Sequence, residues 1–189
     1  MPYTIPNLLT WLRILLIPLF VGMFYFPDSW VSGEDKNIFS SLLFLFAAAT
    51  DWLDGYLARV LEQTSAFGAF LDPVADKLMV AAALIVLVKL GRVNELAAFI
   101  IIGREIAISA LREWMAKIGE SRSVAVSFIG KVKTASQMAA ILLLLYDGRI
   151  LGLDSFSIGT GLIYVAVVLT LVSMAYYLKM AMPFAADPE

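Results

Sequence analysis

The chain is a succession of apolar stretches, each about as long as a lipid bilayer is thick, and this feature most constrains its fold. The run from Ser155 to Leu178 contains no charged residue, and a run of that length spans a bilayer as a helix without further argument. Five other stretches can span it if their charges lie at the ends or face inward: residues 8–26, 38–59, 70–89, 95–116 and 127–146. We therefore expect an all-α integral membrane protein with six transmembrane helices. Because the connections between these helices are short, we expect them to form a single domain over residues 1–189.

The composition limits the chemistry that this chain can perform. Apolar residues make up 61% of the chain and charged residues 16%, whereas soluble domains have about 45–50% and about 25%. The sequence has no cysteine and no histidine, which excludes thiolate nucleophiles, imidazole bases and metal sites built from either residue. A net charge of −2 provides no basic field, so we expect no nucleic-acid partner. Catalysis must therefore use carboxylates, Lys, Arg, hydroxyls or a metal ion that accepts oxygen ligands.

Lysine and arginine are unevenly divided between the two ends of the predicted helices. The end that carries both chain termini has nine of them: Arg13, Arg59, Arg104, Arg112, Lys117, Arg122, Lys131, Lys133 and Lys179. The opposite end has four: Lys36, Lys89, Arg92 and Arg149. Positive residues favour the cytoplasmic side, so we expect both termini and the 60–69 and 117–126 loops in the cytoplasm. Six aromatic residues near the predicted span ends suit the membrane interface: Trp11, Trp30, Trp114, Tyr146, Tyr176 and Tyr177.

Four aspartates lie within 26 residues of this apolar chain: Asp51, Asp54, Asp72 and Asp76. An aspartate at the centre of a membrane helix costs about 2.5–3.5 kcal/mol on insertion scales, so four unpaired ones would approach ~10 kcal/mol. Nearness to the interface lowers that cost, but a purely structural helix has no reason to carry it. The aspartates therefore indicate a function.

The spacing of these aspartates places them on two helix faces. Four residues of the second predicted helix recur at i, i+3, i+4 and i+7 and form one stripe: Asp51, Asp54, Gly55 and Ala58. Three residues of the third recur at i, i+4 and i+8: Gly68, Asp72 and Asp76. The small residues let a bulky group approach the backbone beside the carboxylates. Pro73 indicates that the third helix either begins there or is kinked there.

The two acidic stripes are expected to face each other near the cytoplasmic side, because a short connection over 60–67 makes these helices antiparallel neighbours. Four converging carboxylates repel one another unless cations lie between them. Oxygen ligands suit Mg²⁺, Mn²⁺ or Ca²⁺, and two such ions suit attack on a phosphorus centre. Two alternatives remain open: the aspartates line the ion path of a transporter, or they pair with nearby cations, namely Arg59, Lys77, Arg104 and Arg112.

The arrangement Asp51-x-x-Asp54-Gly55-x-x-Ala58-Arg59, followed by Gly68-x-x-x-Asp72-x-x-x-Asp76, resembles the signature of the CDP-alcohol phosphotransferase family at all eight positions. Eight positions at fixed spacing on adjacent helices are far more specific than one short motif. The resemblance disfavours the transporter alternative. Further segments resemble bacterial family members that use sn-glycerol 3-phosphate: residues 5–13, 67–77, 104–113 and 130–134.

The resemblance implies a reaction, cofactors and partners. The reaction transfers the phosphatidyl group of CDP-diacylglycerol to sn-glycerol 3-phosphate and releases CMP. Serine, inositol phosphate or phosphatidylglycerol are alternative acceptors. Members of the family are described as homodimers of six-helix chains that hold two Mg²⁺ (or Mn²⁺) ions with the four aspartates. For this chain the resemblance implies a homodimer in the bacterial inner membrane, surrounded by membrane lipids.

The resemblance also implies roles for individual residues. It assigns Asp76 as the general base, but metal ligation competes with proton uptake, so Asp76 alternatively acts by positioning alone. It assigns CDP-diacylglycerol binding to eight residues: Asn7, Thr10, Asp51, Asp54, Gly55, Ala58, Arg59 and Gly68. For Asn7 and Thr10, capping of the first helix is an alternative that needs no ligand.

The phosphate of the acceptor requires cations, and the fourth and fifth predicted helices supply them. Arg104 and Arg112 are eight residues apart and therefore share a face, with Ser109 one step around the helix. Lys131 and Lys133 are two apart and cannot both point the same way. Arginine suits phosphate oxygens, whereas a lysine at a helix end commonly extends to the membrane surface without a ligand. Arg104 has the alternative of pairing with a carboxylate: Glu105 or Asp76.

Overall fold

The computed structural model describes residues 5–60, 66–119 and 128–185, and this part of the chain is mostly helical. Its six helices are α1 (Ile5–Met23), α2 (Gly33–Val60), α3 (Ala66–Lys89), α4 (Glu95–Lys117), α5 (Phe128–Tyr146) and α6 (Ser155–Ala185). Two short antiparallel strands, β1 (Arg149–Ile150) and β2 (Leu153–Asp154), form a hairpin between α5 and α6. The described residues therefore form six helices, as predicted, with a hairpin in one connection that hydropathy does not reveal. That all six cross a membrane stays a prediction.

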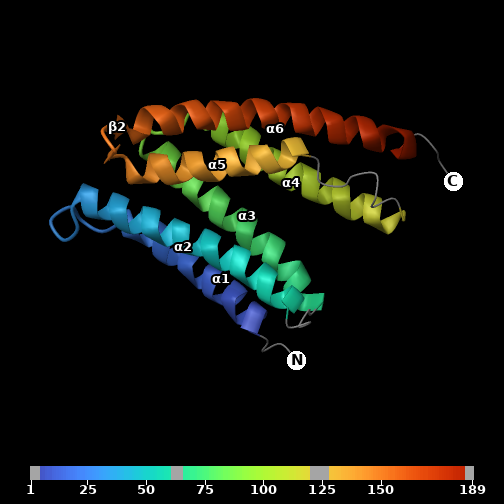
Figure 1. Ribbon diagram of the computed structural model, residues 1–189, viewed down its shortest axis with the longest axis horizontal. Coiled ribbons are helices and arrows are strands. Elements are labelled where there is room, and N and C mark those ends of the chain that lie inside the picture. Colours follow the sequence, from blue (N-terminus) through green and yellow to red (C-terminus); the bar gives the residue numbers. More distant parts are fainter. Residues whose placement is uncertain (1–4, 61–65, 120–127, 186–189) are drawn as a thin grey trace.

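The helices run alternately in opposite directions along the long axis of the molecule (Figure 1). One end of the bundle carries the start of α1, the end of α6 and the start of α5; we call this the terminal end. The opposite, hairpin end carries β1 and β2 with residues 24–32 and 90–94. Short connections enforce this arrangement, because a helix joined by a few residues must return alongside its predecessor.

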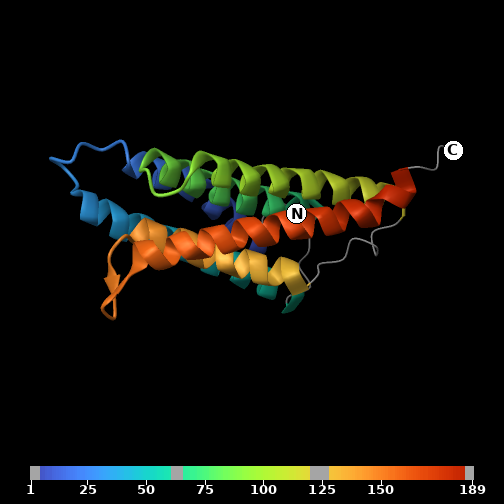
Figure 2. The ribbon, with the colours of Figure 1, turned by 90° about the horizontal axis from the view of Figure 1, so that it is seen from above.

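Packing divides the helices into two groups that share one core. α1 lies along both α2 and α3, and it contacts each of them more extensively than they contact each other. On the other side α5 packs closely against α6, which also contacts α4 (Figure 2). Contacts of α5 with α2 and α3 join the groups. The shared core is built from large buried side chains of all six helices, among them Phe20, Phe44, Leu84, Leu87, Ile101, Ile141, Leu144 and Ile163.

Side chains and turns explain where several helices begin and end. α2 begins at Gly33 rather than at the predicted residue 38, because the Ser32 hydroxyl accepts the Asp35 backbone N–H at 3.1 Å and caps the helix. Asn94 caps α4 by accepting the Leu96 N–H at 2.9 Å. α3 ends where Gly91 adopts a positive φ of 70°, a conformation that costs glycine little.

Pro73 lies inside α3, which begins at Ala66. Of the two expectations for this proline, a helix start is therefore wrong. Since α3 is already formed before Pro73, Asp72 and Asp76 lie one turn apart on one continuous helix, as the spacing predicts.

Large apolar side chains cover much of the outer surface. Phe99 is 73% exposed, and Leu96 and Ile85 are similarly open. Within the described residues, the stretch Ser155–Phe184 of α6 is long and apolar enough to cross a membrane, and only 28% of its most apolar window is buried in the protein. An apolar helix that the protein itself does not cover needs another apolar environment. This stretch contains the uncharged run on which the membrane prediction rests.

Candidate active site

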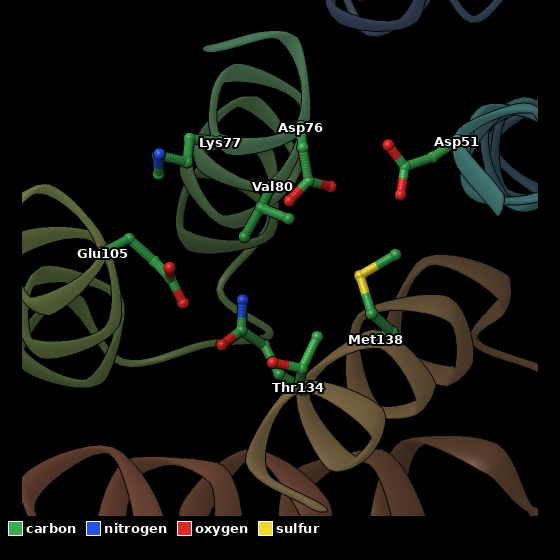
Figure 3. Close-up of a pocket in the computed structure, with 8 residues that line it drawn as sticks. Asp51, Asp76, Lys77, Val80, Glu105, Thr134 and Met138 are labelled. Carbon is green, nitrogen blue, oxygen red and sulfur yellow. The ribbon is translucent and has the colours of Figure 1, made fainter. Parts of the chain in front are cut away.

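A cavity of about 190 Å³ lies between α2, α3, α4 and α5. Asp51 of α2 and Asp76 of α3 point toward one another across it (Figure 3). The expectation that the two acidic stripes face each other is met by this pair. Six further residues complete the lining: Lys77, Val80, Glu105, Thr134, Gln137 and Met138.

α1 supports the aspartates of both neighbouring helices. The Arg13 side chain is 1% exposed, and its Nη1 lies 2.5 Å from Oδ1 of Asp51. The Thr10 hydroxyl, also buried, donates a hydrogen bond to Oδ1 of Asp72. α1 therefore connects one carboxylate of α2 to one of α3, which explains why it packs along both helices.

The bounds of α1 rule out one interpretation of its polar residues. Thr10 and Asn7 lie inside a helix that has already formed at Ile5, so neither residue is an N-cap and the capping alternative is wrong. Thr10 instead contacts an aspartate of the signature.

Part of the predicted site lies outside the described side chains: Asn7, Asp54, Gly55, Ala58 and Arg59, which belong to α1 and α2. Gly68 is buried on α3. Among the side chains that the structure describes, no group of three or more acidic residues is arranged to hold a metal ion. The predicted four-aspartate site includes Asp54 and so remains a prediction.

The chemistry of the described donors nevertheless fits a divalent cation. Asp51 and Asp76 face one cavity, and Asp72 lies one turn from Asp76. Carboxylate oxygens are the ligands that Mg²⁺ and Mn²⁺ prefer. The Arg13 contact uses Oδ1 of Asp51, and the Thr10 contact uses Oδ1 of Asp72. These two contacts therefore leave Oδ2 of each carboxylate for a cation.

Arg104 and Arg112 share one face of α4, as predicted, and that face packs against α6. Arg104 Nη2 donates to the Ser173 hydroxyl, and Arg112 Nη2 donates to the Tyr177 hydroxyl, both at 3.1 Å. The Tyr177 ring lies between the two guanidinium groups, with its centroid 5.6 Å from Cζ of Arg104 and 5.3 Å from Cζ of Arg112. Ser109 is half-buried on the same helix.

Lys133 of α5 joins this cluster through Glu105. The Lys133 side chain is 1% exposed, and its Nζ forms an ion pair with Oε1 of Glu105. The same Oε1 lies 3.8 Å from Nη1 of Arg104, so Arg104 does approach a neighbouring carboxylate, as one alternative held. Lys131 is exposed, which agrees with the prediction that the two lysines point in different directions. We call Arg104, Arg112 and Lys133 the basic cluster.

The basic cluster has more positive charge than its protein partners neutralise. Within the described part of the chain, Glu105 is the carboxylate that contacts it, and it serves both Lys133 and Arg104. The Nε atoms of Arg104 and Arg112 are buried without a hydrogen-bond partner among the described residues. Buried donors without partners are costly. The cluster is therefore suited to accept an anion.

Three residues of the site were not predicted as such from the sequence. Its position near a span end predicts that Tyr177 is an interfacial aromatic, but the residue is fully buried against both arginines, so that prediction is wrong. Ser173 lies one turn before it on α6, and this i, i+4 pair of hydroxyls in an apolar helix was the available signal. Glu105 was considered only as a partner for Arg104; an acid within an apolar stretch was again the signal.

Comparisons with known proteins identify the family. Residues 3–172 match the family model described as CDP-alcohol phosphatidyltransferase. Two full-length relatives, from Pectobacterium atrosepticum and Yersinia enterocolitica, are 50% and 49% identical over 191 residues that cover 100% of both chains. A third, from Salmonella paratyphi A, is 49% identical and covers 96% of each chain. All three are named CDP-diacylglycerol–glycerol-3-phosphate 3-phosphatidyltransferase. The chain described here therefore belongs to the CDP-alcohol phosphatidyltransferase family.

Proposed function

We propose that this protein transfers the phosphatidyl group of CDP-diacylglycerol to sn-glycerol 3-phosphate and releases CMP. The names of relatives that are about half identical over essentially the whole chain support this reaction. In it, the acceptor hydroxyl oxygen forms a bond to the phosphatidyl phosphorus, the bond from that phosphorus to CMP breaks, and the hydroxyl proton leaves.

The observation that carries the choice of acceptor is the basic cluster beside the carboxylate-lined cavity. Glu105 connects the two, because it lines the cavity and contacts both Lys133 and Arg104. A phosphorylated acceptor supplies the anion that the buried guanidinium donors lack. Serine or plain glycerol would leave these donors without a partner, which disfavours both as acceptors.

We assign the two substrates to different parts of the site. The acceptor phosphate is assigned to the basic cluster with Ser109 and Lys131 at its margin. CDP-diacylglycerol is assigned to the face formed by Asn7, Thr10, Asp51, Asp54, Gly55, Ala58, Arg59 and Gly68. The support for the second assignment is the match of the family model over the whole signature and the contact that joins Thr10 to Asp72.

Members of this family generally depend on a divalent metal ion, and we propose two Mg²⁺ or Mn²⁺ ions for this protein. Asp51, Asp54, Asp72 and Asp76 are the residues that would hold them. When bound, such ions would stabilise negative charge on the phosphoryl oxygens and on the leaving CMP.

The protein's own groups then bind the acceptor, orient it and accept the proton of its hydroxyl. Asp76 faces the cavity and is the candidate to accept the hydroxyl proton, or to orient the hydroxyl if its oxygens are engaged elsewhere. Arg13 neutralises part of the negative charge beside the cavity through Asp51. The basic cluster fixes the acceptor by its phosphate, so that its hydroxyl meets the phosphorus within one site.

In the membrane, we propose six transmembrane helices with both termini in the cytoplasm, in a homodimer in the bacterial inner membrane. The bundle supports this topology, because its helices alternate in direction, and α1 begins and α6 ends at the terminal end (Figure 1). Thr10, Asp51, Asp76 and Lys133 all lie in the half of their helices nearest that end. These positions support an active site near the cytoplasmic side, where a water-soluble acceptor is present.

A CMP-release assay with purified protein, CDP-diacylglycerol and a panel of acceptors tests this function. We expect release with glycerol 3-phosphate and little with serine, inositol phosphate, phosphatidylglycerol or glycerol. If another acceptor is used better, the acceptor assignment is wrong. Ion flux in sealed vesicles without any need for CDP-diacylglycerol would instead support the transporter alternative.

A further inference from the structure

We propose that Glu105 competes with the acceptor phosphate for Lys133 and thereby weakens the hold of the basic cluster on phosphate monoesters, so that the product can leave. This inference rests on the proposed function. It gives Glu105 a role that acts through Lys133, and it predicts that loss of the Glu105 charge strengthens anion binding.

The position of Glu105 suits a competing anion. It is carried by α4, and its carboxylate points into the cavity that Asp76 and Asp51 also line (Figure 3). Its Oε1 forms the ion pair with Lys133 and lies 3.8 Å from Nη1 of Arg104. One carboxylate oxygen therefore lies between two of the three cations that are assigned to the acceptor phosphate.

The burial of the two partners differs in a way that permits exchange. The Lys133 side chain is 1% exposed, whereas the Glu105 side chain is 23% exposed. A buried ammonium needs an anion at all times, but Glu105, whose carboxylate already faces the cavity, can move away from Lys133 within that space. An arriving phosphate can thus take the place of Glu105 at Lys133 without leaving that lysine unpaired.

The chemistry of the reaction explains why such competition is useful. The acceptor hydroxyl reacts, so its phosphate monoester is unchanged and is present in the product as well. A site that held this group with three uncompensated cations would also retain the product. By competing for Lys133, Glu105 lowers the affinity for acceptor and product together, and slow product release limits turnover in many enzymes.

The test compares Glu105→Gln with a matched control on the same helix. Glu113 also pairs with a lysine, since its Oε1 lies 3.0 Å from Nζ of Lys117, but both side chains are about 70% exposed. We expect Glu105→Gln to lower the KM for glycerol 3-phosphate and the inhibition constant of inorganic phosphate by about fivefold each, and to lower kcat. Glu113→Gln should change none of these values.

A second measurement does not depend on activity. Loss of the Glu105–Lys133 pair should lower the thermal stability of Glu105→Gln without ligand. Added inorganic phosphate should then raise its unfolding temperature by more than it raises that of the wild-type protein. A merely structural role predicts the first change without the second.

The outcomes separate this inference from the proposed function. If the wild-type protein does not use glycerol 3-phosphate, the proposed function fails. If the wild-type protein uses it but Glu105→Gln binds phosphate no more tightly, only the role of Glu105 is wrong. Should Glu105→Gln fail to fold, Glu105→Asp replaces it, because aspartate is one methylene shorter and withdraws the charge from Lys133. This variant must then lower the inhibition constant of inorganic phosphate and increase the rise in unfolding temperature that phosphate causes. Unchanged values of both overturn the proposal.

Discussion

Replacing Arg112 by alanine tests the acceptor site at the point where its geometry is clearest. Among the described residues, the Arg112 side chain donates a hydrogen bond of 3.1 Å to the Tyr177 hydroxyl and places its Cζ 5.3 Å from the centroid of that ring. A hydrogen bond between a charged and a neutral group contributes about 1.5–3 kcal/mol, and a cation–π contact contributes about 0.5–2 kcal/mol. Because the mutation also removes the cost of burying a charge, we expect Arg112→Ala to lower the free energy of unfolding by only about 1–2 kcal/mol.

The effect on the acceptor should be larger and selective. Loss of one charge-assisted contact to phosphate costs about 1.5–3 kcal/mol, which is about a tenfold to hundredfold fall in kcat/KM for glycerol 3-phosphate. The KM for CDP-diacylglycerol should change little, because that substrate is assigned to the α1–α3 side of the site. Steady-state kinetics with each substrate varied in turn, in mixed micelles, measure both values.

Arg92 at the hairpin end provides a matched control. Its Nη1 donates to the carbonyls of Leu144 and Leu145, and its Nη2 contacts Asn37 and, at 2.9 Å, Asp147. Arg92→Ala should therefore destabilise the protein at least as much as Arg112→Ala but leave the KM for glycerol 3-phosphate unchanged. If Arg112→Ala raises the KM of both substrates equally, or if glycerol serves as well as glycerol 3-phosphate, the reasoning about this site is refuted.

Three further predictions concern single residues. Asp72→Asn or Asp76→Asn should abolish turnover while the protein still inserts and purifies, as an activity assay beside size-exclusion chromatography would show; near-normal activity would remove that aspartate from the catalytic site. Tyr177→Phe keeps the ring but loses the hydroxyl partner of the arginine, so the acceptor KM should rise by about threefold to tenfold; an unchanged KM would show that the hydroxyl is dispensable. The hydrogen bond and charge of Lys36 lower the pKa of Asp28 below its usual value of 3.8. The Asp28–Lys36 pair therefore stabilises the fold above pH 3.8, and this stabilisation is lost as the pH falls through the lower pKa that Asp28 has in the folded protein. Thermal unfolding of wild-type protein and Asp28→Asn should therefore differ at neutral pH and converge in acid.

The helices could be predicted from the sequence because the bilayer imposes a length on each apolar stretch. Their ends could not, because helices continue past the apolar region where caps and charged turns allow it. α2 begins at Gly33 with Glu34 and Asp35 in its first turn, and α6 continues beyond Leu178 to Ala185. Hydropathy locates the apolar segment, whereas capping and solvent determine where the helix ends.

The part of the site that depends on periodicity was also predictable. Asp51 and Asp76 face one cavity because helical spacing places each on an inward stripe, and Lys131 and Lys133 differ in burial because they are two residues apart. Contacts between distant segments were not predictable. Thr10 meets Asp72 across 62 residues of sequence only because α1 packs against both acidic helices.

Tyr177 shows why residue type alone misleads. A tyrosine near a span end has the same apolar ring and polar tip whether it lies at the membrane interface or buries its hydroxyl against an arginine. Only the packing of α6 on α4 decides between these places. The basic cluster therefore needed the three-dimensional structure, although each of its members was visible in the sequence.

The most direct test of the central claim is to follow both products of the reaction at once. Purified protein is supplied with CDP-diacylglycerol, Mg²⁺ and glycerol 3-phosphate labelled in its glycerol carbons, and CMP and label in the lipid fraction are measured over time. The proposed function predicts one labelled lipid for each CMP released, and neither product after chelation of the divalent ion. Release of CMP without transfer of label to lipid, or transfer that continues unchanged without divalent ions, would contradict it.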